Sequence, residues 1–378
     1  MTPGRCTTGR ALVFPARMTD HGTTPRLRVD DFEYELPADA IAQTPAEPRD
    51  ASRLLVLDRA RSSSGAPALA HTTFAKIGDW LRPGDLLVVN DSRVMPARLP
   101  ARRAGGGAVE LLVLRPLDDG EGRWEALVRP SRKVRDGEIV EVGDGEKVQV
   151  GERLGAGTRA IRFARDAHEV MAAAGEMPLP PYIIDRSAPA ERYQTVYARP
   201  PGSAAAPTAG LHFTPELLER LAARGNAHVS VTLHVGLDTF RPLEGDFVDE
   251  HHIHREWFEV PAATRQAVEA TREAGGRVVA VGTTAVRVLE TAAAGAAASG
   301  WTDLYITPPH RFRQVDALIT NFHLPRSSLL LLVTAFVQAG LPGSPTAHEA
   351  RDTLLAAYRE ALGSGYRFFS FGDAMLIV

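Results

Sequence analysis

Residues 277–290 read RVVAVGTTAVRVLE, and this stretch decides the predicted fold. Arg277 to Val281 is a continuous apolar run of strand length, the next three residues break it, and a helical pattern follows from Ala285. The same order of strand and polar or glycine-containing turn recurs at residues 228–236, 316–325 and 368–373. Strands that alternate with helices in this way predict an α/β fold with a largely parallel sheet or barrel.

The turns that follow these strands carry polar side chains and glycines. In a parallel sheet the ligand lies at the carboxyl ends of the strands, so we expect one pocket that these turns share. The residues concerned are His234 and Gly236, Gly282 to Thr284, Asn321 with His323, and Asp373.

Residues 96–165 differ from the rest of the chain in their sequence pattern. Short β-type runs such as WEALVR and KVQV are separated there by turns rich in Gly and Asp, which predicts a small antiparallel barrel or sandwich. This segment interrupts an α/β domain that we expect to consist of residues 26–95 and 166–378. Residues 1–25 are expected to be a disordered tail or, with Met18 as the true start, a mis-assigned N-terminus.

The composition excludes several classes of protein. The chain has 378 residues, 44% of them hydrophobic and 24% charged, which is typical of a globular protein of two or three domains. Its net charge of −3 excludes a globally basic nucleic-acid binder, so any such contact must come from a local patch. The single cysteine, Cys6, allows no internal disulfide. With no signal peptide and no apolar run long enough for a bilayer, we expect a cytoplasmic chain without a membrane partner.

Two motifs in the second half of the chain are suited to binding an anion. The first, AAPTAGLHFT at residues 205–214, precedes a helix whose N-cap is Thr214, and free N–H groups at a helix start favour phosphate or carboxylate. An ordinary tight turn with His212 as a cap is the alternative. The second is GTTAVRVLE, where Thr283, Thr284 and Arg287 can present donors, although either threonine can serve simply as the N-cap.

Histidines supply the candidates for acid–base chemistry and for a metal. His234 stands near the end of its strand with Asp238 four residues on, and histidine has the pKa range that proton transfer needs. His251, His252, His254 and Glu256 invite a metal hypothesis, but their spacing is not that of a known zinc motif. A solvated polar loop, or a loop over the pocket, is the preferred interpretation, and we expect no metal.

Taken together, long ordered strings across residues 27–378 resemble the S-adenosylmethionine:tRNA ribosyltransferase-isomerases of queuosine biosynthesis. The strings that carry the resemblance are RDASRLLVLD from Arg49, LLVVNDSRVMPARL from Leu86, MPLPPYI from Met177, RYQTVYA from Arg192, AAPTAGLHFT from Ala205, LHVGLDTFRP from Leu233, GTTAVRVLE from Gly282, VDALITNFHLPRSSLLLLVTAF from Val315 and YRFFSFGDAMLI from Tyr366. Departures are confined to single positions within matching strings: Asp238 replaces a usual Gly, Ile253 replaces Met, and residues 307–310 differ from the usual Pro-Gly-Tyr form.

The resemblance implies a barrel-like α/β catalytic domain with an inserted small antiparallel β-barrel. It implies transfer and isomerisation of the ribosyl group of S-adenosylmethionine onto 7-aminomethyl-7-deazaguanine at the tRNA wobble position, which gives epoxyqueuosine-tRNA, adenine and methionine. S-adenosylmethionine is then a consumed substrate, and no cofactor is expected. Whether the enzyme is a monomer or a homodimer stays open.

The candidate site residues fall into three groups. We expect catalysis from His234, His212, Asp238 and His254, with His234 or His212 as the base and the other as an acid towards adenine. Substrate binding is expected from Thr208, Gly210, Gly236, Thr283, Thr284, Arg287, Asn321, His323 and Asp373. Contact with tRNA is expected from the basic cluster Arg129, Arg132, Lys133 and Arg135, and from Asn90, Arg93 and Arg98.

Two other classes of function stay open at this point. A metal-dependent hydrolase would use His251, His254 and Glu256, and chelator insensitivity would exclude it. A non-catalytic RNA-binding protein would release no adenine from S-adenosylmethionine in the presence of a competent tRNA.

Overall fold

The stretch at residues 277–290 lies at the centre of the molecule, as strand β14 (Val278–Val281) followed by helix α4 (Thr283–Ala293). In the computed structural model, which describes residues 26–117, 122–155, 157–236 and 243–378, β14 pairs in parallel with a strand on each side. All four of its residues are buried. A strand covered on both faces reads as a continuous apolar run, which is why the sequence pattern was strong here.

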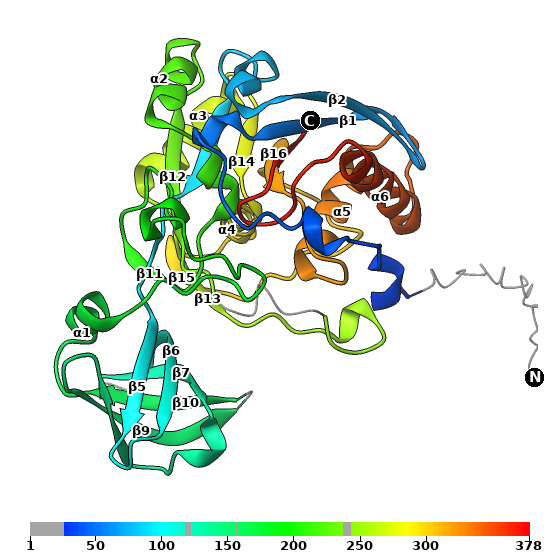
Figure 1. Ribbon diagram of the computed structural model, residues 1–378. Coiled ribbons are helices and arrows are strands. Elements are labelled where there is room, and N and C mark those ends of the chain that lie inside the picture. The colour runs from blue at the N-terminus through cyan, green and yellow to red at the C-terminus, as the bar shows by residue number, and fades with distance from the viewer. Residues whose placement is uncertain (1–25, 118–121, 156, 237–242) are drawn as a thin grey trace, which may run out of the picture.

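Nine strands form one mixed sheet in the order β15, β13, β12, β3, β14, β16, β17, β1, β2 (Figure 1). The parallel pairs are β12–β3, β3–β14, β14–β16 and β17–β1, and the others are antiparallel. Their bounds are β1 (Arg53–Ser63), β2 (Ala66–Thr73), β3 (Leu86–Asn90), β12 (His228–Leu233), β13 (Glu256–Glu259), β15 (Ser299–Thr302), β16 (Ala317–Asn321) and β17 (Ala374–Ile377). In the described residues the sheet has edges at β15 and β2.

Alternate residues of the central strands point into two different hydrophobic clusters. Val278 and Ala280 face the cluster that includes side chains of α3 (Ala262–Glu273), α4, α5 (Ser328–Gly340) and α6 (Ala347–Gly363). Val279 and Val281 face the cluster built with α2 (Pro215–Ala223) and a 3-10 helix, η4 (Phe74–Asp79). Helices therefore cover both faces of the sheet, as the α/β prediction requires. No described helix combines the length and apolarity needed to cross a membrane.

Six antiparallel strands close a small barrel in the order β10, β7, β6, β5, β8, β9. Their bounds are β5 (Arg98–Arg103), β6 (Ala108–Pro116), β7 (Arg123–Arg129), β8 (Glu138–Val142), β9 (Glu146–Gly155) and β10 (Thr158–Phe163). The barrel has its own hydrophobic cluster, into which α1 (Ala167–Ala174) inserts Val170 and Met171. The barrel is connected to the sheet body, the part of the molecule built on the nine-stranded sheet, next to a two-stranded parallel pair of β4 (Arg93–Val94) and β11 (Pro201–Ser203) (Figure 1). The α/β class with an inserted antiparallel barrel is confirmed.

One predicted strand is wrong. Phe368–Phe371 forms a turn, in which the amide of Gly372 donates to the carbonyl of Phe369, and the strand follows it as β17. The apolar run reflects buried rings: Phe368 stacks on Phe322 with ring centres 4.5 Å apart. Ring burial in a turn and burial in a strand produce the same local pattern, so the sequence did not separate them.

The turns expected to share a pocket do meet at one edge of the sheet. Because β12, β3, β14 and β16 are parallel, their carboxyl ends lie together. β17 runs antiparallel to β16 and pairs Ala374 with Asn321, so the turn before it lies at the same edge. The barrel is attached through residues that follow β3, on the same side as this edge (Figure 1).

Candidate functional site

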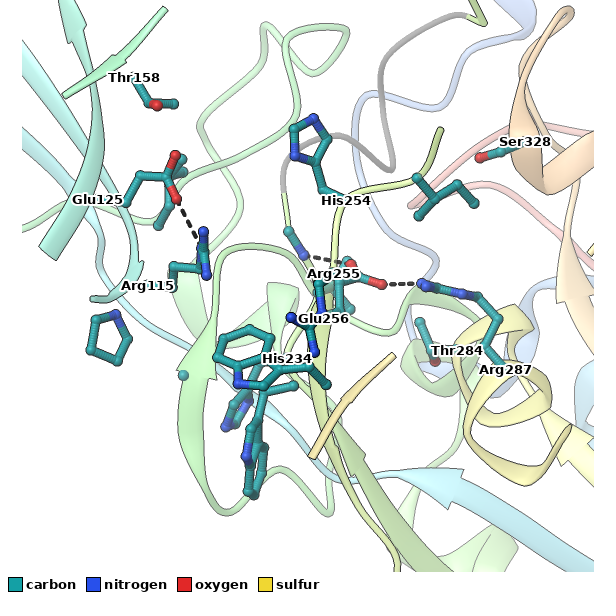
Figure 2. Close-up of a pocket in the computed structure, with 18 of the residues that line it drawn as sticks. Arg115, Glu125, Thr158, His234, His254, Arg255, Glu256, Thr284, Arg287 and Ser328 are labelled. Carbon is teal, nitrogen blue, oxygen red and sulfur yellow. Dashed lines mark hydrogen bonds and ion pairs between the residues drawn. The ribbon is translucent and has the colours of Figure 1, made fainter. Parts of the chain in front are cut away.

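A cavity of about 670 Å³ lies between the barrel and the carboxyl edge of the sheet (Figure 2). This volume is within the range of pockets that bury a small-molecule ligand. The barrel side contributes Arg115, Trp124, Glu125, Leu127, Thr158 and His168. The sheet side contributes Gly202, His234, Val235, Gly236, His254, Glu256, Trp257, Thr283, Thr284, Arg287 and Trp301, with Ser328, Leu329 and Leu332 from α5.

His234 follows β12 and is held at the cavity wall by contacts on several sides. Its Nδ1 lies 2.7 Å from Ser92 Oγ, and its ring stacks on Trp257 with centres 5.1 Å apart. A Cβ on Gly202 would lie 2.5 Å from Nε2, so a larger residue at this position would displace the ring. Asn90 fixes the strand end by exchanging two hydrogen bonds with the backbone of Leu233.

Burial lowers the pKa of His234 to about 4. The cause is desolvation, which disfavours the charged imidazolium. Its ordinary pKa is near 6.5, so at neutral pH the ring is uncharged in this site. The imidazole is uncharged at neutral pH, and the Ser92 hydroxyl holds one of its nitrogens. It is therefore suited to accept a proton from a substrate and not to donate one as an imidazolium.

Arg287 projects from α4 into a buried ion pair with Glu256 of β13. Nε donates to the carbonyl of Leu304 and Nη1 donates to Glu256 Oε2, while Gly236 N donates to Glu256 Oε1 (Figure 2). The remaining nitrogen, Nη2, is buried and has no hydrogen-bond partner among the described residues. A buried guanidinium nitrogen without an acceptor is a favourable place for an anionic ligand group.

The start of α4 offers further donors beside Arg287. Its N-cap is Gly282, which has no side chain to satisfy the free amides of the first turn. The hydroxyl of Thr284 is buried without a hydrogen-bond partner in the described parts of the chain. Thr284 and Arg287 are three residues apart and therefore lie on one face of the helix. Together these donors make this part of the cavity wall suitable for an anionic group.

A second, smaller cavity of about 60 Å³ adjoins the first, and both are lined by Val235, Thr283, Thr284 and Leu329. It brings together Thr208, Asn321 and His323 from the predicted set. Thr208 donates to Asn321 Oδ1 over 2.8 Å, and His323 Nε2 lies 2.8 Å from Thr320 Oγ1. Burial lowers the pKa of His323 to about 3, so this ring is uncharged as well.

Three predicted site residues, His212, Gly210 and Asp373, line neither cavity, so their contact with substrate stays a prediction. His212 is 4% exposed, with Nδ1 2.7 Å from Ser52 Oγ and Nε2 accepting from Asn321. Burial lowers its pKa to about 3, which makes it unsuitable as the acid. Gly210 packs where a Cβ would lie 2.1 Å from the Tyr197 hydroxyl oxygen. Asp373 is buried, and its two oxygens accept backbone amides of Arg53 and Arg367.

His254 lines the main cavity and lies on the same segment as Glu256, two residues before it (Figure 2). The histidine-rich segment at residues 251–256 was the candidate metal site. The described residues contain no group of three His, Cys, Asp or Glu side chains placed to hold an ion. Glu256 is instead engaged by Arg287 and Gly236. The candidate Asp238 lies outside the described residues.

The predicted tRNA contacts differ in how they are placed. Arg129, Arg132, Lys133 and Arg135 are exposed around a 3-10 helix, η5 (Ser131–Lys133), on the barrel. Arg93 is paired with Glu191 at 2.9 Å and Arg98 with Glu110 at 3.0 Å. Asn90 is fully buried and supports the strand end before His234 through a hydrogen bond to the carbonyl of Leu233. Its contact with tRNA stays a prediction.

Sequence reasoning missed the barrel side of the cavity and its aromatic lining. Three of the four tryptophans of the chain line the cavity: Trp124, Trp257 and Trp301. Trp257 and Trp301 are cross-strand neighbours on β13 and β15. Glu125 and Arg115, also missed, are cross-strand neighbours on β7 and β6. Only the alternation of WEALVR hinted at this, since it places Glu125 on the outside of the barrel.

Comparisons with known proteins give matches over almost the whole chain. The family described as "Queuosine biosynthesis protein" matches residues 29–377. The S-adenosylmethionine:tRNA ribosyltransferase-isomerase of Symbiobacterium thermophilum is 51% identical over 362 residues, which cover 93% of this chain and 100% of the relative. The protein of the same name from Thermotoga maritima is 49% identical over 356 residues, with 93% of this chain and 100% of the relative covered.

A solved structure shows a related chain. The crystal structure of S-adenosylmethionine tRNA ribosyltransferase from Thermotoga maritima superposes with a TM-score of 0.51 at 40% identity, and it covers 92% of this chain and 100% of that one. The family match and the curated relatives span nearly the whole described chain. This chain is therefore an enzyme that belongs to the S-adenosylmethionine:tRNA ribosyltransferase-isomerase family of queuosine biosynthesis.

Proposed function

We propose that the enzyme transfers and isomerises the ribosyl group of S-adenosylmethionine onto the aminomethyl group of 7-aminomethyl-7-deazaguanine at the wobble position of tRNA. The products are epoxyqueuosine-tRNA, adenine and methionine, and S-adenosylmethionine is consumed as a substrate without any further cofactor. The observation that carries the proposal is the cavity of about 670 Å³, which is lined by the uncharged His234 and by Thr284 and Arg287, whose buried donors have no partner in the described chain. The barrel that forms its other wall carries the exposed basic cluster. A tRNA substrate also favours the cytoplasm as the place of reaction.

His234 is proposed as the base. The sulfonium of S-adenosylmethionine acidifies the neighbouring 5′ C–H of the ribose, and removal of that proton opens the ring with loss of adenine. His234 suits this step because it lines the cavity and is uncharged at neutral pH. Adenine leaves more readily when protonated, and His254 is the second predicted histidine that lines the same cavity. We therefore assign His254 as the acid in place of the buried His212.

The methionine carboxylate is proposed to bind at the start of α4. Arg287 Nη2 and Thr284 Oγ1 are both buried without partners in the described chain, and a carboxylate supplies the acceptors that they lack. Thr283 and Gly236 line the same cavity. The adjoining cavity, with Thr208, Asn321 and His323, extends the polar surface available to the same substrate.

The exposed basic cluster on the barrel is proposed to hold tRNA phosphates. We expect affinity for tRNA to fall with salt, and the slope of log K against log salt to flatten by about 1.4 in the Arg132→Gln/Lys133→Gln double variant, because two phosphate contacts are lost. Arg61→Gln/Arg359→Gln is the charge-matched control, since both residues are exposed and lie on β1 and α6, elements of the sheet body away from the barrel (Figure 1). Filter binding over a salt series measures both slopes, and an equal slope in the two double variants contradicts the assignment.

Adenine release tests the function as a whole. Purified enzyme, S-adenosylmethionine and tRNA that carries the aminomethyl precursor are expected to yield adenine and methionine in equal amounts, with the added mass on the wobble nucleotide. The same mixture with tRNA that carries an unmodified guanine at that position lacks the accepting amine and is expected to yield no modified tRNA. Chromatography of the bases and mass spectrometry of the tRNA digest measure both. Absence of adenine with the competent tRNA rejects the proposed reaction.

A further inference from the structure

The barrel contributes a carboxylate to the cavity that none of the roles above uses. Among the described residues that line the main cavity, only Glu125 and Glu256 carry carboxylates. Glu256 is engaged by Gly236 N and by Arg287 in the wall of the sheet domain. Glu125 lies on β7 at the opposite wall, where Figure 2 shows it facing the cavity from the barrel side.

Neighbouring side chains fix the position of Glu125. Its Oε2 accepts from Arg115 Nε over 2.8 Å, and the two residues are directly opposite on adjacent strands. The guanidinium carbon of Arg115 lies 5.3 Å from the ring centre of Trp301 on the sheet domain. Arg115 therefore links the barrel carboxylate to the sheet side of the cavity. It donates to Oε2 of Glu125, and because each carboxylate oxygen has two lone pairs, both oxygens can still accept from a ligand.

A carboxylate in this position matches one edge of a guanine-type base. The N1–H and the 2-amino group are adjacent donors, and two carboxylate oxygens accept from such a pair. The 7-substituent is on the opposite side of that bicyclic base. When the donor edge faces the barrel, the 7-aminomethyl group therefore points across the cavity towards His234 and the start of α4.

The face of β7 that carries Glu125 also leads to the basic cluster. Side chains alternate along a strand, so Glu125, Leu127 and Arg129 share one face, and the burial pattern places Trp124, Ala126 and Val128 on the other. Glu125 and Leu127 line the cavity, and Arg129 begins the exposed cluster. A tRNA strand whose phosphates bind the basic cluster is thus positioned to place a base beside Glu125. The indoles of Trp257 and Trp301 line the same cavity and are available to stack on that base.

We propose that Glu125 is the specificity-determining residue that recognises the N1–H and 2-amino edge of the acceptor base, and that Arg115 positions it. This inference rests on the proposed function, because it assumes that the acceptor is a 7-deazaguanine in tRNA. It assigns the barrel a role in selecting the base in addition to holding the backbone.

The test compares two acceptor tRNAs that differ only in the 2-amino group: one with 7-aminomethyl-7-deazaguanine and one with 7-aminomethyl-7-deazahypoxanthine. We expect the unaltered enzyme to prefer the first in kcat/KM by about 10–100-fold. Glu125→Gln presents an amide N–H₂ to one of the two donors, so kcat/KM for the first tRNA falls by about the same factor and the preference is lost. The KM for S-adenosylmethionine stays unchanged, which shows that the variant is folded.

Two matched variants separate recognition from loss of an ion pair. Arg115→Gln removes the partner but keeps the carboxylate, so the preference for the 2-amino group is reduced but retained. Glu152→Gln removes a different barrel ion pair, that of Arg123 and Glu152 at 2.6 Å, whose acid is not among the cavity residues, and the preference is unaltered. A full preference in Glu125→Gln overturns the inference. Failure of the unaltered enzyme to act on either tRNA rejects the proposed function instead.

Discussion

Replacing His234 with alanine is expected to lower kcat by about 10²–10⁴-fold, the range for loss of a positioned acid–base group. The ring lines the cavity, is uncharged at neutral pH, and is held by Ser92 and Trp257. Its removal leaves the proton beside the sulfonium without an acceptor. Single-turnover measurement of adenine release at saturating substrates reports this step directly, because it is independent of the later release of tRNA.

A histidine at the other end of the same strand provides the control. His228 begins β12 and is exposed, so His228→Ala is expected to retain turnover while it makes the same chemical change. Near-normal turnover in His234→Ala contradicts the assignment of the base. Thermal unfolding of both variants shows that any loss in His234→Ala is not a loss of fold.

The pH dependence has a definite sign. Burial lowers the pKa of His234 to about 4, and the base must be uncharged to accept a proton. Protonation of this group therefore reduces kcat/KM only as pH falls towards about 4, and titration of His234 has no effect between pH 6 and 8. The contrary result is a pH profile of kcat/KM in which the unaltered enzyme loses activity with a midpoint near the ordinary histidine pKa and His234→Gln does not. That result contradicts the burial of this ring.

The sequence predicted the sheet edge well because the signals there are local. The run RVVAV followed by Gly282 and two threonines indicates a buried strand and a turn without any knowledge of neighbours. Parallel pairing then places His234, Thr284 and Asn321 at one edge, as the structure shows. The strand predicted at Phe368–Phe371 was wrong because the signal there is not local. The apolar residues serve ring packing with residues distant in the chain, such as Phe322.

The choice between His234 and His212 could not be made from sequence. Both stand near glycines at the ends of elements, but Ser52 and Asn321 enclose His212 in the interior, whereas His234 faces the cavity. Ser52 is 160 residues and Asn321 is 109 residues away from His212 in the chain. Glu125 was missed for a similar reason: local alternation places it outside the barrel, and only the docking of the barrel against the sheet gives that outer face a function.

Replacing Thr284 with valine is expected to raise the KM for S-adenosylmethionine by about 10-fold or more without destabilising the protein, since a hydrogen bond to a charged group contributes about 1.5–3 kcal/mol. The hydroxyl of Thr284 is buried and unpartnered in the described residues. No protein hydrogen bond is therefore lost with it, and thermal stability is expected to be equal or higher. Initial-rate kinetics give the KM and calorimetry gives the stability.

Arg287→Ala is expected to raise the same KM by at least as much, but with a large loss of stability. The substitution breaks the buried ion pair between Arg287 and Glu256, and loss of one member of such a pair costs about 3–5 kcal/mol. Adding Glu256→Gln removes the charge of the other member while its amide oxygen still accepts from Gly236, so stability recovers in part. The KM stays high in the double variant because the guanidinium that we assign to the methionine carboxylate is still absent.

The two substitutions separate ligand binding from structural support, because Thr284 and Arg287 share one helix face but differ in their protein contacts. If the start of α4 holds the carboxylate, both raise the KM and only Arg287→Ala lowers the stability. If Arg287 acts only as the partner of Glu256, Thr284→Val leaves the KM unchanged and the double variant returns it to normal. That second pattern removes the carboxylate from α4 and leaves the ion pair as a support for Gly236 and the cavity wall beside His234.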